Sequence, residues 1–295
     1  MPRDALQDTL LRVWRGLPTF GGRSSLRTWL FRIATNACLD VIARRPKRVL
    51  PIDLGPPTAV PTADLGPPLV ESIWVEPYPD EALGLAAGYA VPEARYEQRE
   101  AVELAFIAAL QHLSAKQRAV LILREVLGFS AQEVGDSLDV SVASVNSALQ
   151  RARRTVADRL PERSQQETLR SLGDQRIREL VDAYVDAWSR GDVAALRALL
   201  AEDAVFSMPP WSSWWRGRET IAGFAEHFCA DMRPVVTCAN GQVALANYAL
   251  DDKTGRYVAS ALAVLTFEGT RVKEITGFVI PEIFPRFGLA PALEP

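Results

Sequence analysis

Residues 113–160 read LSAKQRAVLILREVLGFSAQEVGDSLDVSVASVNSALQRARRTVADRL. Ser114 and Ser130 are each followed, three residues later, by a glutamine or a glutamate, which is the capping-box signature of a helix start. Gly128 is placed to end the first of these helices. Residues 139–141 are short and polar enough to form a turn before another helix. The pattern therefore predicts three helices with a tight turn between the last two.

The last of these predicted helices has two distinct faces. Its apolar side chains recur at helical spacing and are Val142, Val145, Leu149, Ala152 and Val156. The opposite face is polar and then basic, with Ser144, Asn146, Ser147, Gln150, Arg151, Arg153 and Arg154. Amide side chains can pair with base edges while arginines neutralise phosphates, so the arrangement is typical of a helix-turn-helix in a DNA major groove. The alternative is an ordinary helical hairpin with a solvated basic end, which the capping, turn length and basic placement disfavour.

Composition limits the other classes of function. A chain of 295 residues is long enough for two or three domains, and its formal net charge of -3 gives no global positive field. Three scattered cysteines and two histidines do not provide a disulfide framework, a zinc site or a histidine triad. We therefore expect a cytoplasmic chain with no catalytic residue, no metal and no cofactor. No long apolar run predicts a membrane span.

The first 45 residues predict two more helices. Gly16 and Pro18 end the first, and a loop at Gly21 precedes the second. The second carries a polar stripe at intervals of four residues, consisting of Arg32, Asn36, Asp40 and Arg44. The helices are either plain core helices with solvated faces or an aromatic and basic surface for single-stranded DNA. Composition alone does not decide between these interpretations.

A family resemblance does discriminate between them. The stretch DALQDTLLRVWRGLPTFGGRSSLRTWLFRIATNACLDVIARR resembles the second conserved region of group 4 sigma factors, the extracytoplasmic-function family. The helix-turn-helix stretch resembles their fourth region, and the two in this order are far more specific than either alone. The resemblance implies a cytoplasmic subunit that binds core RNA polymerase and directs it to promoter DNA for transcription initiation.

The resemblance also assigns residue roles. In the family, the first helix docks on the clamp of the largest polymerase subunits, and here the matching residues are Asp4, Asp8, Thr9, Arg12 and Trp14. The second helix reads and melts the −10 element, with Asn36 at the flipped base, flanked by Arg32, Asp40 and Arg44. The helix from residue 141 reads the −35 element through the seven polar and basic residues of its outer face.

Two departures from the family pattern stand out. The second region normally begins with about another pair of helical segments, so only part of its helical bundle is present here and we expect an apolar face to lack partners. Many relatives also carry Lys or Arg where Asn146 and Ala148 stand. Fewer cations predict fewer phosphate contacts and a shallower salt dependence, and Asn146 could pair with an adenine instead.

A proline-rich linker is expected over residues 46–92, which hold ten of the twenty prolines and six acidic residues against two basic ones. Its segment IWVEPYPDEAL, residues 73–83, contains aromatic residues that a plain linker does not need. We interpret it either as a segment that docks on the chain's own C-terminal domain or as a local collapse. A helix is predicted from residue 93 to residue 113.

The C-terminal segment, residues 174–285, begins with amphipathic helices and continues with strands, which favours an α+β cone in which antiparallel strands form a curved sheet around the helices. One helix is predicted from residue 219 to residue 232. LLAEDAVFSMPPW, GRETI and ANGQVALANY, in this order, resemble the SnoaL-like branch of the NTF2-like fold. The resemblance implies a domain that regulates the sigma factor in cis, although the fold also hosts enzymes.

Aromatic and polar residues of this domain are candidates for a pocket. They are Tyr184, Trp188, Trp211, Trp214, Trp215, His227, Asp231 and Tyr248. They line an apolar core or pocket, bind a sensed ligand, or serve catalysis, and the strands offer few inward acids for the last of these. The tryptophan cluster could equally be a docking face for the linker or the sigma domains.

The expected fold class is therefore multidomain, with all-α sigma segments followed by an α+β NTF2-like cone. The predicted domains are a partial region 2 over 1–45, the linker over 46–92, region 4 over 93–163, the SnoaL-like domain over 174–285 and a tail over 286–295. The rival functions are a SnoaL-like enzyme or sensor, of cyclase or hydrolase type, that carries a DNA-binding domain, and a helix-turn-helix repressor without polymerase contact.

Overall fold

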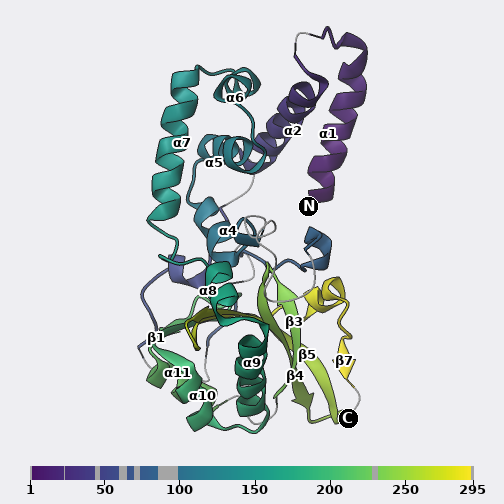
Figure 1. Cartoon of the computed structure of the whole chain (residues 1–295). Helices are drawn as coiled ribbons and strands as arrows, with labels where there is room; N and C mark the ends of the chain where they lie inside the picture. The colour runs from purple at the N-terminus through teal and green to yellow at the C-terminus, as the bar shows by residue number, and fades with distance from the viewer. Residues whose placement is uncertain are drawn as a thin grey trace. The chain divides into compact units, whose positions relative to one another are not determined.

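The structure is a computed structural model that describes residues 2–22, 24–43, 47–59, 65–69, 74–85, 99–227 and 232–293, with side chains from residue 5 onward. The chain forms two compact units, one of residues 1–47 and 109–160 and the other of residues 48–108 and 161–295 (Figure 1). In the described part of the chain, no helix is both long and apolar enough to cross a membrane.

The first unit is entirely helical. Its elements are α1 (Pro2–Gly16), η1 (Leu17–Thr19), α2 (Leu26–Ala43), α5 (Ala115–Leu121), the π-helical turn η5 (Ile122–Val126), α6 (Ala131–Leu138) and α7 (Val142–Ala157). Both predicted capping boxes form: the Ser114 hydroxyl accepts from the Gln117 amide, and the Ser130 hydroxyl accepts from the Glu133 amide. The three predicted helices of residues 113–160 are thus confirmed.

The turn between α6 and α7 is set by backbone contacts. Asp139 adopts a left-handed conformation with φ 53°, and the Val140 amide donates to the Gly135 carbonyl at 2.9 Å. A Cβ atom on Gly135 would lie 2.8 Å from the Val140 carbonyl oxygen, which is closer than real Cβ contacts allow. Glycine is therefore required where α6 meets the turn.

Helix α2 packs against the helical hairpin within this first unit. The Phe31 and Phe129 rings meet at 5.1 Å, and Phe129 is buried. The Arg27 guanidinium lies 4.5 Å from the Phe129 ring centroid and donates to the Leu127 carbonyl at 2.9 Å. These contacts join the N-terminal helices to the helix-turn-helix.

The second unit is an α+β domain with the linker segments attached. Its helices are η2 (Pro51–Asp53), η3 (Glu81–Leu83), α8 (Gln165–Leu172), α9 (Asp174–Ser189), α10 (Val193–Leu199), α11 (Arg218–Ala225) and η7 (Pro281–Phe287). Its strands are β1 (Leu200–Ser207), β2 (Trp214–Arg216), β3 (Met232–Ala239), β4 (Gln242–Asp251), β5 (Arg256–Glu268), β6 (Arg271–Phe278) and β7 (Ala292–Leu293). They form one sheet in the order β2-β1-β6-β5-β4-β3, with β7 on β5.

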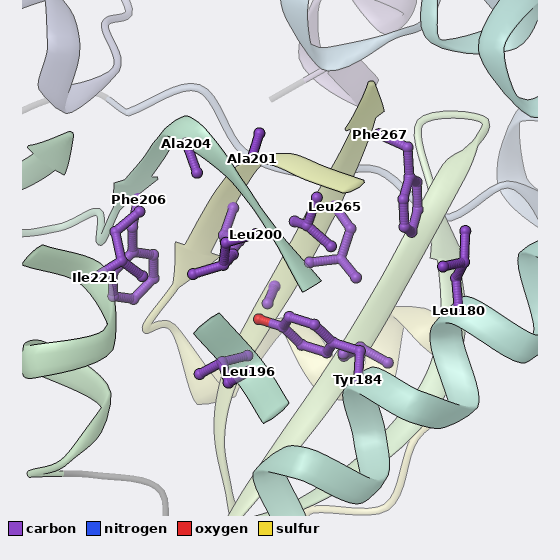
Figure 2. Close-up of a cluster of buried hydrophobic side chains, with 14 of the residues drawn as sticks. Leu180, Tyr184, Leu196, Leu200, Ala201, Ala204, Phe206, Ile221, Leu265 and Phe267 are labelled. Carbon is purple, nitrogen blue, oxygen red and sulfur yellow. The ribbon is translucent and has the colours of Figure 1, made fainter. Parts of the chain in front are cut away.

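The sheet buries both of its faces. One face packs with α9, α10 and α11 into a cluster that includes Tyr184, Leu196 and Leu265, and Figure 2 shows these side chains converging from helices and strands. The other face packs with Leu50 and Phe284. The linker therefore contributes to the second layer of the core.

The expected run of antiparallel strands is confirmed from β3 to β6, and β1 joins this sheet by pairing with β6 in parallel. Two expectations about helices were wrong. Helix α11 ends at Ala225 and does not continue to residue 232. The helix predicted from residue 93 to 113 is interrupted, since α4 (Leu104–Gln111) begins only after a turn.

The interruption before α4 has a tertiary cause. The Leu104 amide donates to the Gln242 side-chain oxygen at 2.9 Å, and the Val102 carbonyl accepts from the Asn240 side-chain amide at 2.8 Å. These bonds occupy backbone groups that a continuous helix would pair internally. The predicted residues 93–98 lie outside the described residues.

Candidate functional site

The outward face of α7 carries the residues predicted to read DNA. Asn146, Ser147, Gln150, Arg151, Arg153 and Arg154 are exposed, and Ser144 is half-buried. Val145 and Ala152, on the opposite face, are fully buried. Packing of the apolar face against the rest of the hairpin therefore fixes which side chains point outward.

Two of these residues have partners within the first unit. Arg153 forms an ion pair with Glu125 at 2.7 Å, and Ser144 accepts from the Lys116 ammonium at 3.5 Å. The first contact offsets the charge of Arg153. Lys116, which the sequence reasoning missed, places a cation beside the start of α7. Its only signal in the sequence is its position in the first turn of the helix that Ser114 caps.

Helix α2 exposes the predicted −10 residues along one stripe. Arg32, Asn36 and Asp40 are all exposed, while Arg44 lies outside the described residues. Asp40 pairs with Arg12 of α1 at 2.9 Å, and Arg12 also pairs with Asp8 at 2.8 Å. Hydrogen bonds to these carboxylates hold the pKa of Arg12 above its usual value. The structure thus links residues predicted for polymerase binding to one predicted for the −10 element.

Helix α1 presents an exposed apolar stripe. Leu6, Leu10 and Trp14 are spaced four residues apart and expose 61%, 58% and 75% of their surfaces. The Thr9 hydroxyl donates to the Ala5 carbonyl at 2.7 Å, and nothing is described of the Asp4 side chain. Side chains this apolar and this exposed along one face are typical of an interaction surface.

The C-terminal domain contains an apolar cavity of about 470 Å³. Four of the predicted pocket residues line it, namely Tyr184, Trp188, Trp211 and His227. Phe206 and Phe224 extend its aromatic wall, and Asn247 and Ser260 add an amide and a hydroxyl. The structure therefore brings residues from α9, β1, α11, β4 and β5 around one space.

Three predicted pocket residues lie elsewhere. Trp215 is fully buried in a ring cluster with Phe206 and Phe224 and does not line the cavity. Tyr248 points to the opposite face of the sheet, where its hydroxyl donates to the Ala290 carbonyl at 2.9 Å, because neighbouring residues of a strand face opposite ways. Trp214 packs toward the linker, with its indole donating to the Gly55 carbonyl at 2.9 Å.

Linker residues pair with the loop and strand that carry the tryptophans. The Trp211 indole donates to the Gly66 carbonyl at 2.8 Å, and the Leu69 amide donates to the Pro210 carbonyl at 2.9 Å. The Thr58 amide donates to the Trp214 carbonyl at 2.7 Å. Together with the bond from Trp214 to Gly55, these contacts form what we term the tryptophan latch.

A second set of contacts holds the aromatic linker segment. The Tyr78 backbone amide donates to the Asn240 side-chain oxygen at 2.8 Å, and the Asn240 backbone amide donates to the Tyr78 carbonyl at 3.0 Å. The Gly241 amide donates to Asp80 at 2.7 Å. Both sets lie within the second unit.

The described cavity wall offers His227 but no carboxylate for acid–base chemistry. Among its described lining residues, none is Asp, Glu, Lys or Arg, and the candidate Asp231 lies outside the described residues. Glu274, the residue before Ile275 on β6, is half-buried; desolvation raises its pKa, and its carboxylate accepts from the Thr276 hydroxyl. No group of His, Cys, Asp and Glu that could hold a metal ion occurs in the described part of the chain.

Comparison with protein families matches three parts of the chain. Residues 2–48 match Sigma-70 region 2, residues 103–156 match Sigma-70, region 4, and residues 181–275 match a SnoaL-like domain. The order agrees with that expected from the sequence.

Individual relatives agree with these matches. The chain is 39% identical over 295 residues to the ECF RNA polymerase sigma factor SigG of Mycobacterium tuberculosis, covering 98% of this chain and 77% of that protein. It is 26% identical over 157 residues to the ECF RNA polymerase sigma-E factor of Escherichia coli, covering 53% of this chain and 72% of that one.

Among solved structures, the M. tuberculosis extracytoplasmic function sigma factor SigJ has the same fold. The TM-score is 0.59 at 18% sequence identity, and the match covers 98% of this chain and 91% of that one. In this chain, helical sigma segments are followed by a mixed-sheet domain, so the expected multidomain fold class is confirmed. The chain belongs to the extracytoplasmic-function family of RNA polymerase sigma factors and carries a SnoaL-like domain at its C-terminal end.

Proposed function

We propose that this chain directs core RNA polymerase to specific promoters, with α7 reading the −35 element and α2 reading the −10 element. The observation that carries the proposal is the presence of both sigma regions, with six of the seven predicted −35 residues exposed and with Arg32, Asn36 and Asp40 exposed on α2. The seven residues of the α7 face are proposed for −35 recognition, and Arg32, Asn36, Asp40 and Arg44 for the −10 element. No catalysis by the chain itself is part of this function.

We assign polymerase binding to α1. Its apolar stripe of Leu6, Leu10 and Trp14 gives a partner protein a surface to bury, and Asp8 and Arg12 flank it with charge. Burial of a side chain such as Trp14 removes a large apolar area from water, which favours association.

Promoter engagement requires the first unit to open. The −10 and −35 elements are about 25 base pairs, or roughly 85 Å, apart along B-form DNA. Helix α2 instead packs directly on the hairpin through Phe31, Arg27 and Phe129. The packed arrangement therefore represents a form not engaged with both elements.

The SnoaL-like domain is proposed to regulate this step in cis. The tryptophan latch and the contacts of Tyr78 and Asp80 hold linker segments on that domain. A linker that is held on the SnoaL-like domain is not free to bind along core polymerase. The rival enzyme function has less support, because the described cavity wall lacks a carboxylate.

Co-purification with core polymerase tests the proposal. We expect Leu10→Glu to reduce the amount of polymerase retained by at least tenfold, since it places a charge in an apolar interface. Leu26→Glu is the matched control, because Leu26 is similarly exposed and an acidic residue is favourable in the first turn of α2. Equal retention by both variants would remove α1 as the binding surface, and no retention by the unaltered chain would remove the sigma function.

A further inference from the structure

The cavity of the SnoaL-like domain has the size and chemistry of a ligand site. Its volume of about 470 Å³ falls within the range of small-molecule pockets. Tyr184, Trp188, Phe206, Trp211 and Phe224 supply aromatic surface. Because none of the described lining residues is Asp or Glu, a cationic ligand would lose its hydration without gaining an ion pair, whereas a neutral ligand needs none.

Two polar side chains of the cavity wall are accessible to a ligand. Asn247 and Ser260 both line the cavity and are only half-buried. The amide and the hydroxyl can each donate a hydrogen bond, which an oxygen on a bound molecule would accept. The wall therefore favours a ligand that carries a carbonyl or hydroxyl oxygen.

A β-bulge adds a polar group to the same wall. Asn247 pairs with Ala261 and Tyr248 pairs with Ala259, which leaves Ser260 as the extra residue of β5. Ser260 and Ala261 both line the cavity, although successive strand residues normally face opposite sides. The bulge thus turns the Ser260 hydroxyl toward the Asn247 amide side of the cavity, and bulges of this kind are over-represented next to functional sites.

The linker forms part of the cavity wall. Leu65 lines the cavity, and the next residue, Gly66, accepts the hydrogen bond from the Trp211 indole. Trp211 therefore contacts the cavity with its ring and the linker with its nitrogen. A ligand that touches Leu65 and Trp211 makes more contacts when the linker is docked, and so stabilises the docked form.

We propose that the cavity binds a neutral, planar, predominantly apolar molecule with a carbonyl or hydroxyl oxygen, and that this ligand holds the linker on the SnoaL-like domain. Aromatic rings of the ligand lie among the five aromatic side chains, and its oxygen accepts from the Asn247 amide or the Ser260 hydroxyl. The effect on transcription rests on the proposed sigma function, whereas binding and linker docking do not.

Titration of the full chain with prodan, a neutral naphthalene ketone whose emission shifts to the blue in apolar surroundings, tests the proposal. We expect saturable binding with one site per chain. Asn247→Leu keeps a side chain of similar size and removes the amide donor, and should weaken binding about fivefold. Ala261→Leu places added atoms in the cavity and should abolish saturable binding. Trp29→Phe, in α2, is the matched control and should leave the affinity unchanged.

Amide hydrogen exchange tests the coupling in the absence of polymerase. Saturating prodan should slow exchange at the Leu69 amide, which donates to the Pro210 carbonyl, by at least threefold. The same addition to Ala261→Leu should change nothing. Absence of saturable binding, binding that survives Ala261→Leu, or unchanged exchange at Leu69 would each overturn the proposal. These outcomes do not depend on whether the chain serves polymerase.

Discussion

Glu103 is a buried carboxyl group that accepts backbone amides at the start of α8. Its oxygens accept from Gln166 at 2.8 Å and from Gln165 at 3.3 Å. Burial nevertheless raises the pKa of Glu103 to about 7, since desolvation of the charged form outweighs these bonds. The folded chain therefore binds a proton at pH values where the unfolded chain has released it.

Stability of the second unit should consequently depend on pH through Glu103. Between about pH 4.5 and pH 7 the folded state holds the extra proton, so the free energy of unfolding falls as pH rises and levels off above pH 7. The fall from pH 5.5 to pH 7.5 is of the order of 2 kcal/mol. Urea unfolding at the two pH values measures it.

Glu103→Gln should reduce this difference by that amount, because the amide does not titrate. Glu162→Gln, an exposed glutamate in the segment after α7, is the control and should keep the full difference. An unchanged pH dependence in Glu103→Gln would show that another group is responsible.

Gln150 and Arg151 test the α7 face, because both side chains are exposed there. Gln150→Ala should cost about 1–3 kcal/mol at the −35 element and relax its base preference. Arg151→Ala should weaken binding to all sequences and lower the salt slope by about one. Arg178→Ala in α9 serves as the control. DNA titrations at several salt concentrations measure the affinity and its salt dependence for each variant. Unchanged binding by either α7 variant would remove that residue from the interface.

The residues that face outward from α7 could be predicted, whereas the residues that surround the cavity could be predicted only in part. Helical periodicity alone assigns Val145 to the core and Gln150 to the surface. In contrast, whether Tyr248 or its neighbour Asn247 faces the cavity depends on which face of β4 the helices cover and on the bulge at Ser260 in the paired strand β5, and neither has a signal in the local sequence.

At the scale of elements, the turn between α6 and α7 depends on Gly135. Gly135→Ala would place a methyl group against the Val140 backbone, so we expect a loss of roughly 1–3 kcal/mol in the stability of the first unit and weaker −35 binding. Gly21→Ala is the matched control, since no atom lies within 4 Å of an added Cβ there. Thermal unfolding and DNA titration test this expectation. Equal stability and equal −35 binding of the Gly135→Ala and Gly21→Ala variants would contradict it.

Elements with local signals were predictable, and elements defined by distant partners were not. Ser114, Ser130 and Ser141 cap their helices through bonds three residues away. The start of α4 depends on Asn240 and Gln242, more than 130 residues later in the chain. The parallel pairing of β1 with β6 likewise has no local signature.

For the whole molecule, the tryptophan latch should control how available the linker is. Trp211→Phe with Trp214→Phe removes two hydrogen bonds to linker carbonyls, and should shift the docking equilibrium toward release by about tenfold. Faster amide exchange at Thr58 and higher run-off transcription should follow. Trp29→Phe should show neither effect, and a double variant with unchanged exchange would mean that the latch does not hold the linker.

The most direct test of the central claim is to map the transcripts that core polymerase makes on fragmented genomic DNA of the source organism, with and without this chain. The account predicts new transcript 5′ ends that appear only with the chain, share sequence motifs near −10 and −35, and are lost with Gln150→Ala and Arg151→Ala combined. Identical 5′ ends in the presence and absence of the chain would contradict it.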